Sequence, residues 1–403
     1  MSQFKRVLIA IPSYWIFDRK REAVQHTYEL YDHPTETPRY ETISRLLTSL
    51  GRLDTKGLDV SIVILVAAEH GRARYERFIK KLVEKSKLDK ELKIIFERGL
   101  ADIKRELGSL GYPMVKGGMG LHGYSSVRNV GLFLAQILGC DAIFFLDDDV
   151  IIADGKVLKT LIRASIEEGA GVTGGVYTDR KGRYVLNEEV DCWKHFWNKN
   201  KDINYVLRSL ENRERIETIV MFGGNMLISR DVFQRIPFDP LVPRGEDIDY
   251  AINARYFGFK TLLCRNAGVI HLPPGTQKSY MINYWSKLRG DVSRFLYERQ
   301  KLSAMGISVR ELPDYPRRFM QNIRIRAIMT TLLLMSRSVV LANFDSTKEN
   351  MLNLKRFLWD FPRMASRCKY EYFRFQRNWE RLMSAIESGR QGSETGIDLQ
   401  GLL

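Results

Sequence analysis

Short runs of apolar, mostly β-branched residues alternate with helical patterns through the first two-thirds of the chain. The runs are nearly continuous in apolar residues, which is typical of strands that are covered on both faces. They are residues 6–12, 59–67, 92–96, 142–146, 171–176, 217–222 and 261–265. The helical stretches between them are residues 37–49, 73–87, 125–139 and 157–168. This alternation predicts an α/β fold, Rossmann-like, with a mostly parallel central sheet flanked by helices.

The composition changes near residue 275. The 403-residue chain exceeds the usual size of one compact domain, and its net charge is +15. From residue 281 onward the sequence has no strand pattern, and 21 Lys and Arg stand against 12 Asp and Glu. We therefore expect a catalytic domain over residues 1–275 and a basic α-helical C-terminal region over residues 276–403.

Apolar residues beyond Pro362 recur at steps of three and four, which predicts a helix with one apolar stripe. Most such stripes are core contacts, so a helix packed on the catalytic domain is favoured. A helix that lies on a membrane surface or binds a partner is the alternative. The stripe consists of Met364, Cys368, Tyr372, Phe375, Trp379, Leu382 and Ile386.

Three features bear on the cellular compartment. The four cysteines lie far apart, which excludes a zinc ribbon or a disulfide scaffold and suits a reducing cytoplasm. The apolar run at residues 7–11 ends at Pro12 and is too short for a signal peptide, so it is interpreted as the first strand. Residues 327–344 contain Arg337, whose charge is costly in lipid, so a buried or surface-lying helix is predicted there. We expect a cytoplasmic protein, with peripheral membrane contact through the basic C-terminal helices left open.

Asp147, Asp148 and Asp149 follow a buried strand directly. Three adjacent carboxylates repel one another, and a divalent cation such as Mg²⁺ or Mn²⁺ removes that penalty. Strand alternation points Asp147 and Asp149 to the same side. Asp149 is therefore the leading candidate metal ligand, and Asp147 is expected to contact the metal or a ribose. The alternative is a solvated turn in which two of the carboxylates cap the next helix.

Two further segments are candidates for ligand contact. Arg128 and Asn129, at the start of the helix before this strand, suit nucleotide contacts, or alternatively helix capping and a salt bridge to the aspartates. Gly223 and Gly224, followed by Asn225, allow the backbone to approach a ligand closely or to make a tight turn.

Glu246 and Asp247 lie in the first turn of a predicted helix. The helix dipole favours acids there without any catalytic role. The functional alternative is a general base that deprotonates an acceptor hydroxyl. His271 follows a strand-like run and precedes Pro-Pro-Gly, a stiff turn that could hold the imidazole towards a metal.

The order of these segments resembles the GT-A class of nucleotide-sugar-dependent glycosyltransferases over roughly residues 6–275. The first strand, ending in Ile-Pro-Ser-Tyr at residues 11–14, looks like the nucleotide-binding opening of that class. Glu69 is similar to the acid that often contacts the base. The Arg-Asn-x-Gly helix at residues 128–131, leading into the Asp-x-Asp strand, resembles family-2 members.

The downstream segments extend the resemblance. Residues 223–225 look like the acceptor-side loop, and Gly-Glu-Asp at residues 245–247 looks like the catalytic-acid helix. His271 stands where several members keep a third metal ligand. The sequence departs from the family at residues 68–71, where Ala-Glu-His-Gly replaces the ordinary Asp-Gly-Ser and leaves the nucleotide open. The Gly-Glu-Asp helix occurs in inverting and retaining relatives, so it does not give the stereochemistry.

The resemblance implies a metal-dependent transfer of a sugar from a nucleoside-diphosphate sugar to an acceptor hydroxyl. The cation, Mn²⁺ or Mg²⁺, would be held by Asp149 and His271 with Asp147 close by, and would stabilise charge on the leaving group. Asp247 would be the base if the reaction inverts, with Glu246 as the alternative. The acceptor would be a glycan, a polar solute or a lipid-linked sugar. The residues expected to bind substrate or nucleotide are Pro12, Ser13, Tyr14, Glu69, Arg128, Asp147, Asp148, Gly223, Gly224 and Asn225.

Other classes of protein fit less of the sequence. A nucleotidyltransferase acting on a sugar phosphate would need a glycine-rich basic loop after the first strand, and Pro-Ser-Tyr-Trp at residues 12–15 is not one. The charge of +15 suits a nucleic-acid-binding protein, but three adjacent aspartates would repel the nucleic-acid backbone. A basic membrane-surface protein without activity would leave the aspartates unexplained. We therefore expect no nucleic-acid partner.

Overall fold

The computed structural model describes residues 4–16, 35–36, 41–68, 72–86, 88, 90–189, 192–272 and 280–391. The chain divides into two compact units. The first comprises Met1–Tyr184, Arg213–Gln277 and Phe373–Leu403, and the second comprises Val185–Asn212 and Lys278–Tyr372. The units thus do not follow a single boundary at residue 275, because the end of the chain belongs to the first unit and an internal segment belongs to the second.

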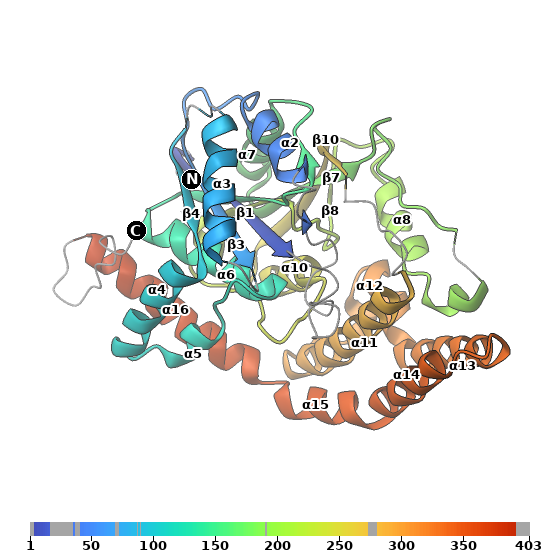
Figure 1. Cartoon of the computed structure of the whole chain (residues 1–403). Helices are drawn as coiled ribbons and strands as arrows, with labels where there is room; N and C mark the ends of the chain where they lie inside the picture. The colour runs from blue at the N-terminus through green and yellow to red at the C-terminus, as the bar shows by residue number, and fades with distance from the viewer. Residues whose placement is uncertain are drawn as a thin grey trace. The chain divides into compact units, whose positions relative to one another are not determined.

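The first unit is built on a ten-stranded sheet, counted within the described residues (Figure 1). The strands on one side of it are all parallel, and adjacent strands pair in the order β4, β3, β1 and β5. Their bounds are β1 (Arg6–Ile16), β3 (Asp59–Ala68), β4 (Leu92–Ile95) and β5 (Ala142–Leu146), and the short β2 (Thr35–Glu36) pairs with β1. Apart from β2, which was not predicted, each lies where an apolar run predicts it, because runs of this kind are typical of strands that are covered on both faces.

The other side of the sheet is mixed. β9 (Asn225–Ser229) lies antiparallel between β5 and β7 (Ala170–Thr178), and β10 (Lys260–His271) is parallel to β7. The short strands β6 (Val150–Ile151) and β8 (Arg215–Glu217) pair antiparallel with β10. The predicted strand at residues 217–222 is wrong: β8 ends at Glu217, and the buried segment after it is irregular. Apolar periodicity does not separate a buried irregular segment from a strand.

Helices cover the sheet, and most of them lie close to their predicted ranges. α6 (Tyr124–Ile137), which leads into β5, is buried over nearly its whole length. The fold class is confirmed as α/β, with a mostly parallel central sheet flanked by helices and a C-terminal helical region. The other helices of this part are α2 (Glu41–Leu50), α3 (Arg72–Ser86), α4 (Glu97–Ser109), α5 (Pro113–Gly117), α7 (Val157–Glu168), α9 (Arg230–Phe233) and α10 (Glu246–Tyr256).

The predicted apolar stripe near the C-terminus belongs to two helices, α15 (Phe361–Cys368) and α16 (Glu371–Arg390). In α16 the favoured interpretation is confirmed, because its apolar side packs on the sheet unit. Trp379 is fully buried, and its indole Nε1 donates to the carbonyl oxygen of Phe233 at 2.8 Å. Gln376 donates to the carbonyl oxygen of Arg235 at 2.7 Å. α16 is therefore part of the sheet unit's core.

The second unit consists of helices in its described residues. α13 covers most of the apolar stretch that includes Arg337. No helix in the described part of the chain is both long and apolar enough to cross a membrane. The elements of this unit are η2 (Cys192–Trp197), α8 (Asn200–Arg208), α11 (Tyr280–Ala304), η3 (Val309–Glu311), α12 (Asp314–Gln321), α13 (Ile323–Val340), α14 (Phe344–Lys355), η4 (Arg356–Asp360) and α15.

Candidate active site

The carboxyl ends of β1 and β5 place Ser13 beside the middle aspartate of the trio. The Ser13 hydroxyl donates a hydrogen bond to Oδ2 of Asp148, and the indole Nε1 of Trp15 donates to the Ser13 Oγ at 2.9 Å. Both Ser13 and Asp148 are buried. Because parallel strands end at one edge of the sheet, the predicted nucleotide-binding strand and the acidic strand meet at this edge.

Asp149 and His271 form a pair. The Nε2 atom of His271 lies 3.3 Å from Oδ2 of Asp149, and the backbone NH of Leu272 donates to the Asp149 carbonyl oxygen at 2.9 Å. Register aligns His271 of β10 with Val150 of β6, which brings the imidazole to the acidic turn. Burial alone would lower the pKa of His271, but the hydrogen bond and the charge of Asp149, with that of Asp147, raise it above its ordinary value.

Tyr177, at the end of β7, links the two ends of this cluster, and sequence reasoning missed it. Its hydroxyl donates to Oδ2 of Asp147 at 2.7 Å and accepts from the backbone NH of Gly224 at 2.9 Å. Its ring stacks on the His271 imidazole with centroids 4.6 Å apart. Burial and the charge of Asp147 raise the pKa of Tyr177 well above 10.0. The available signal was an aromatic residue ending a buried strand at the same edge of the sheet.

Arg128 is buried next to Asp147 and Glu246, and only 3% of its surface is exposed. It donates from Nε to Glu246 at 2.9 Å, from Nη1 to the Gly223 carbonyl oxygen at 2.8 Å, and from Nη2 to Asp147 at 3.3 Å. Burial opposes its charge, but Glu246 and Asp147 outweigh burial and raise its pKa. Of the roles left open for Arg128, the structure shows a salt bridge to one of the three aspartates, Asp147.

Glu246 and Asp247 begin α10 and differ in environment. Glu246 is buried and paired with Arg128. Burial raises the pKa of Glu246, and the charge of Asp247 adds to this while Arg128 opposes it. Asp247 is half-buried, and its Oδ2 accepts a hydrogen bond from the backbone NH of Gly223 at 3.1 Å. Of the two carboxylates, Asp247 is the more open to a molecule arriving from solvent.

The loop at residues 223–225 packs tightly against these side chains. A Cβ atom on Gly224 would collide with the Asp147 carboxylate and the Tyr177 hydroxyl, and one on Gly223 would lie 2.6 Å from Nη2 of Arg128. Asn225 is fully buried, and its Nδ2 donates to the carbonyl oxygen of Ala267 at 2.7 Å. The glycines are therefore needed for close approach of the backbone to the charged network.

The remaining predicted residues lie near this edge or outside the description. Pro12 is half-buried and Tyr14 is buried, and both flank Ser13 in β1. Asn129 is fully buried and bonds to the backbone at Gly118 and Phe238, which makes it a packing residue. Glu69 lies outside the described residues.

Two side chains, Asp149 and His271, are available to bind a cation, rather than the three that were predicted. Among the described residues, no group of three or more His, Cys, Asp and Glu side chains is arranged to hold a metal ion. Both oxygens of Asp147 are engaged, by Arg128 and by Tyr177. Asp149 and His271 offer a carboxylate oxygen and an imidazole nitrogen side by side, which fits Mn²⁺ or Mg²⁺ that completes its coordination with phosphate and water oxygens.

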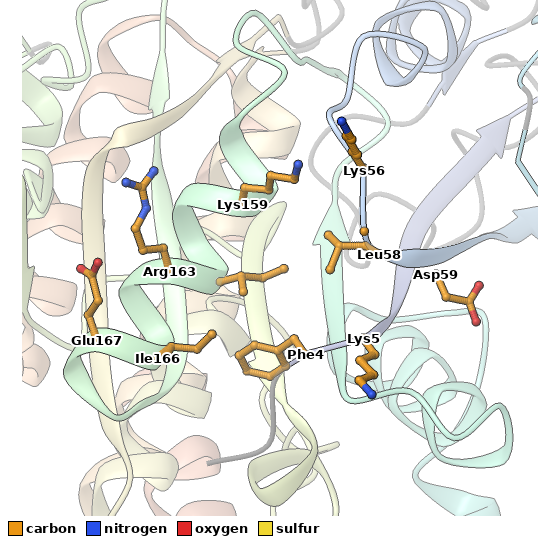
Figure 2. A pocket seen from close by; sticks show the side chains of 11 residues that line it. Phe4, Lys5, Lys56, Leu58, Asp59, Lys159, Arg163, Ile166 and Glu167 are labelled. Carbon is orange, nitrogen blue, oxygen red and sulfur yellow. The ribbon is translucent and has the colours of Figure 1, made fainter.

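A separate pocket of about 820 Å³ lies at the amino ends of β1 and β3, beside α7 (Figure 2). Lys5, Lys56, Lys159 and Arg163 surround an apolar floor there that includes Phe4. None of the candidate site residues lines it. The pocket is therefore distinct from the cluster, which lies at the carboxyl ends of the same strands.

No protein-family model matches the chain, and no curated protein matches its sequence. Solved structures similar to it include the mannosyltransferase PcManGT from Pyrobaculum calidifontis in complex with GDP-Man and Mn²⁺. That likeness has 11% identity, covers 93% of this chain and 86% of that one, and has a TM-score of 0.45. TarS from S. aureus, residues 1–349, is 13% identical over 96% of this chain and 92% of that one, with a TM-score of 0.40.

A third similar structure is glucosyl-3-phosphoglycerate synthase from Mycobacterium tuberculosis in complex with Mn²⁺, UDP-Glc and phosphoglyceric acid. It is 11% identical, covering 75% of this chain and 80% of that one, with a TM-score of 0.40. The function proposed below therefore rests on the side chains of this chain and on their arrangement at the carboxyl edge of the sheet.

Proposed function

We propose that the chain is a metal-dependent glycosyltransferase that moves a sugar from a nucleoside-diphosphate sugar to an acceptor hydroxyl. The observation that supports this most is the meeting of Ser13, the three aspartates and His271 at the carboxyl ends of β1, β5 and β10. Ligands of open α/β sheets bind at this edge. Several carboxylates beside one imidazole suit a cation that shares its coordination with phosphates.

Asp149 and His271 are the proposed metal ligands. When bound, a divalent cation there would neutralise the diphosphate and stabilise the charge that develops on the leaving group. Asp147 is held by Arg128 and Tyr177, so we propose that it orients the donor rather than completing the metal site. Ser13 and Asp148, with Pro12, Tyr14 and Glu69, stay as proposed nucleotide contacts.

The remaining side chains position the reacting groups. The Arg128–Glu246 pair is buried, and Arg128 also contacts Asp147 and the Gly223 carbonyl oxygen, so we propose that it positions both. Asp247, half-buried next to this pair, is the proposed base that takes the acceptor proton if the reaction inverts. Glu246 is a weaker candidate for the base, because its Oε1 already accepts a hydrogen bond from the Arg128 guanidinium.

The proposed partners are a nucleoside-diphosphate sugar and a hydroxyl acceptor in a glycan, a polar solute or a lipid-linked sugar. We propose no nucleic-acid partner, because the carboxylates at the sheet edge would repel a phosphate backbone. The widely spaced cysteines support a proposal that the reaction takes place in the cytoplasm.

The direct test is release of nucleoside diphosphate from a panel of nucleotide sugars after chelator treatment and addition of Mn²⁺ or Mg²⁺. Asp149→Asn and His271→Ala should each lower metal-dependent release by about 100-fold or more, since the cation is asked to supply several kcal/mol. Asp154→Asn is the matched control, because Asp154 is an exposed acid that only accepts a backbone hydrogen bond. If Asp149→Asn turns over a sugar donor as fast as the wild type does, Asp149 is not a metal ligand.

The base is tested separately with Asp247→Asn and Glu246→Gln. Loss of the base should lower kcat far more than it weakens donor binding, which is measured by thermal shift or calorimetry. If Asp247→Asn abolishes donor binding instead, the residue binds substrate and another group is the base.

A further inference from the structure

The helices α13 and α14 of the second unit expose many apolar side chains and bury several polar ones. In α13, Thr330 and Thr331 are fully buried, whereas Ile325 and Val339 are 65% and 63% exposed. The exposed apolar positions recur at helical spacing, so they share one face of the helix. This surface, defined here as the outer apolar surface, includes Ile325, Met329, Leu332, Val339, Val340, Leu341, Phe344, Met351 and Leu352.

The exposure of apolar side chains continues through the turn into α14. Val340 and Phe344, on either side of the turn, are 80% and 83% exposed. Asn350 and Asn353 of α14 are fully buried. The two helices lie side by side (Figure 1). A helix pair that exposes Val and Phe while burying Thr and Asn leaves a large apolar surface in water, and such surfaces mark interaction sites.

Positive charge accompanies the outer apolar surface. Residues 323–370 contain nine Lys and Arg against three Asp and Glu. One of the three acids, Glu349, lies 3.5 Å from Arg289 and 4.0 Å from Arg356, so its charge is partly balanced within the unit. α13 itself contains three arginines and no acid. An anionic partner with an apolar interior therefore complements this part of the chain.

We propose that the outer apolar surface docks on an anionic lipid bilayer, with the basic side chains at the level of the lipid phosphates. The combination of an apolar face and Lys or Arg is typical of helices that lie in the membrane interface. A second copy of this chain fits less well, because it would bring two sets of positive charge together. Nucleic acid would match the charge but not the apolar face. This inference goes beyond the transfer reaction and does not depend on it.

The test is co-sedimentation of the full chain with vesicles of phosphatidylcholine alone and of phosphatidylcholine mixed with phosphatidylglycerol. The wild type should bind the mixed vesicles more tightly, and added salt should weaken that preference. The double variant Val340→Asp and Phe344→Asp should bind the mixed vesicles about tenfold or more weakly, because charged side chains replace the most exposed apolar ones. Lys348→Ala with Lys355→Ala should lower the preference for anionic lipid by roughly tenfold and leave binding to pure phosphatidylcholine unchanged.

Ile166→Asp is the matched control, because Ile166 is 38% exposed in α7 of the other unit and lies outside the outer apolar surface. It should bind vesicles like the wild type. The variants should keep the wild-type circular dichroism melt, since both replaced side chains are exposed. Nucleoside-diphosphate release without vesicles should be unchanged, so loss of lipid binding and loss of activity are distinguishable.

Three results would overturn the proposal. The first is wild-type protein that does not bind anionic vesicles. The second is a double variant, Val340→Asp and Phe344→Asp, that binds these vesicles as tightly as the wild type. The third is self-association of the wild type that increases with concentration in analytical ultracentrifugation and is absent in the double variant. This result would assign the outer apolar surface to contact with a second copy of the chain.

Discussion

Replacing Arg128 with Met should destabilise the sheet unit and should also make its stability strongly dependent on pH. Met has a similar length and can pack against Phe145, whose ring lies 5.2 Å from the guanidinium carbon. It cannot pair with Glu246, which is 2.9 Å from Nε of Arg128 and only 5% exposed. Arg128→Met therefore leaves a carboxylate in a buried position without its cation.

The expected cost follows from that geometry. Removing one partner of a buried ion pair typically costs about 3–5 kcal/mol, because the other charge stays buried without compensation. Glu246→Gln should cost only about 1–2 kcal/mol, since the guanidinium keeps Asp147 and the Gly223 carbonyl oxygen as partners. The double variant should cost roughly 2 kcal/mol less than the sum of the two single ones, because with both residues replaced no carboxylate at position 246 stays buried without its cation.

The pH dependence has a definite sign. In the folded wild type, burial raises the pKa of Glu246 above its ordinary value. The stability associated with the protonated carboxyl is complete below the ordinary pKa of Glu and is lost as the pH rises through the raised value. Without Arg128 the opposing influence disappears and the pKa of Glu246 rises further. The gap in stability between wild type and Arg128→Met should therefore widen from acidic to neutral pH.

The assay is urea denaturation followed by circular dichroism, repeated at a series of pH values from acidic to neutral. A loss below about 1 kcal/mol for Arg128→Met, or strict additivity with Glu246→Gln, would refute the view that the two residues form a buried, coupled pair.

Two further predictions concern backbone approach and helix docking. Gly224→Ala should lower both activity and stability, because a Cβ atom at this position would collide with the Asp147 carboxylate and the Tyr177 hydroxyl. Gly99→Ala is the control, since nothing lies within 4 Å of a Cβ atom there, and it should leave both quantities unchanged in the same activity and melting assays. Trp379→Ala should cost about 3–5 kcal/mol in urea denaturation because the side chain is fully buried, and Trp359→Ala, which is 52% exposed, should cost far less; equal losses would contradict the docking of α16 on the sheet unit.

Local pattern was sufficient for six of the ten described strands and for the position of the acids. The runs that predict β1, β3, β4, β5, β7 and β10 form strands in those places, because continuous apolar runs between helices have few other stable arrangements. The aspartates were placed at the carboxyl end of β5 by sequence alone. Pattern did not predict β9, which lies antiparallel between β5 and β7 although it follows both of them in the chain.

The other contacts in the candidate site join residues that are far apart in the sequence. Arg128 and Glu246 are 118 residues apart, and Tyr177 reaches Asp147 from another strand, so no local spacing indicates either contact. The exposure of apolar side chains on α13 has the same origin, because which side of a helix meets water depends on the neighbours that pack against it. Sequence periodicity describes each element by itself, whereas burial and charge pairing are properties of several elements together, and only their assembly in the tertiary structure sets them.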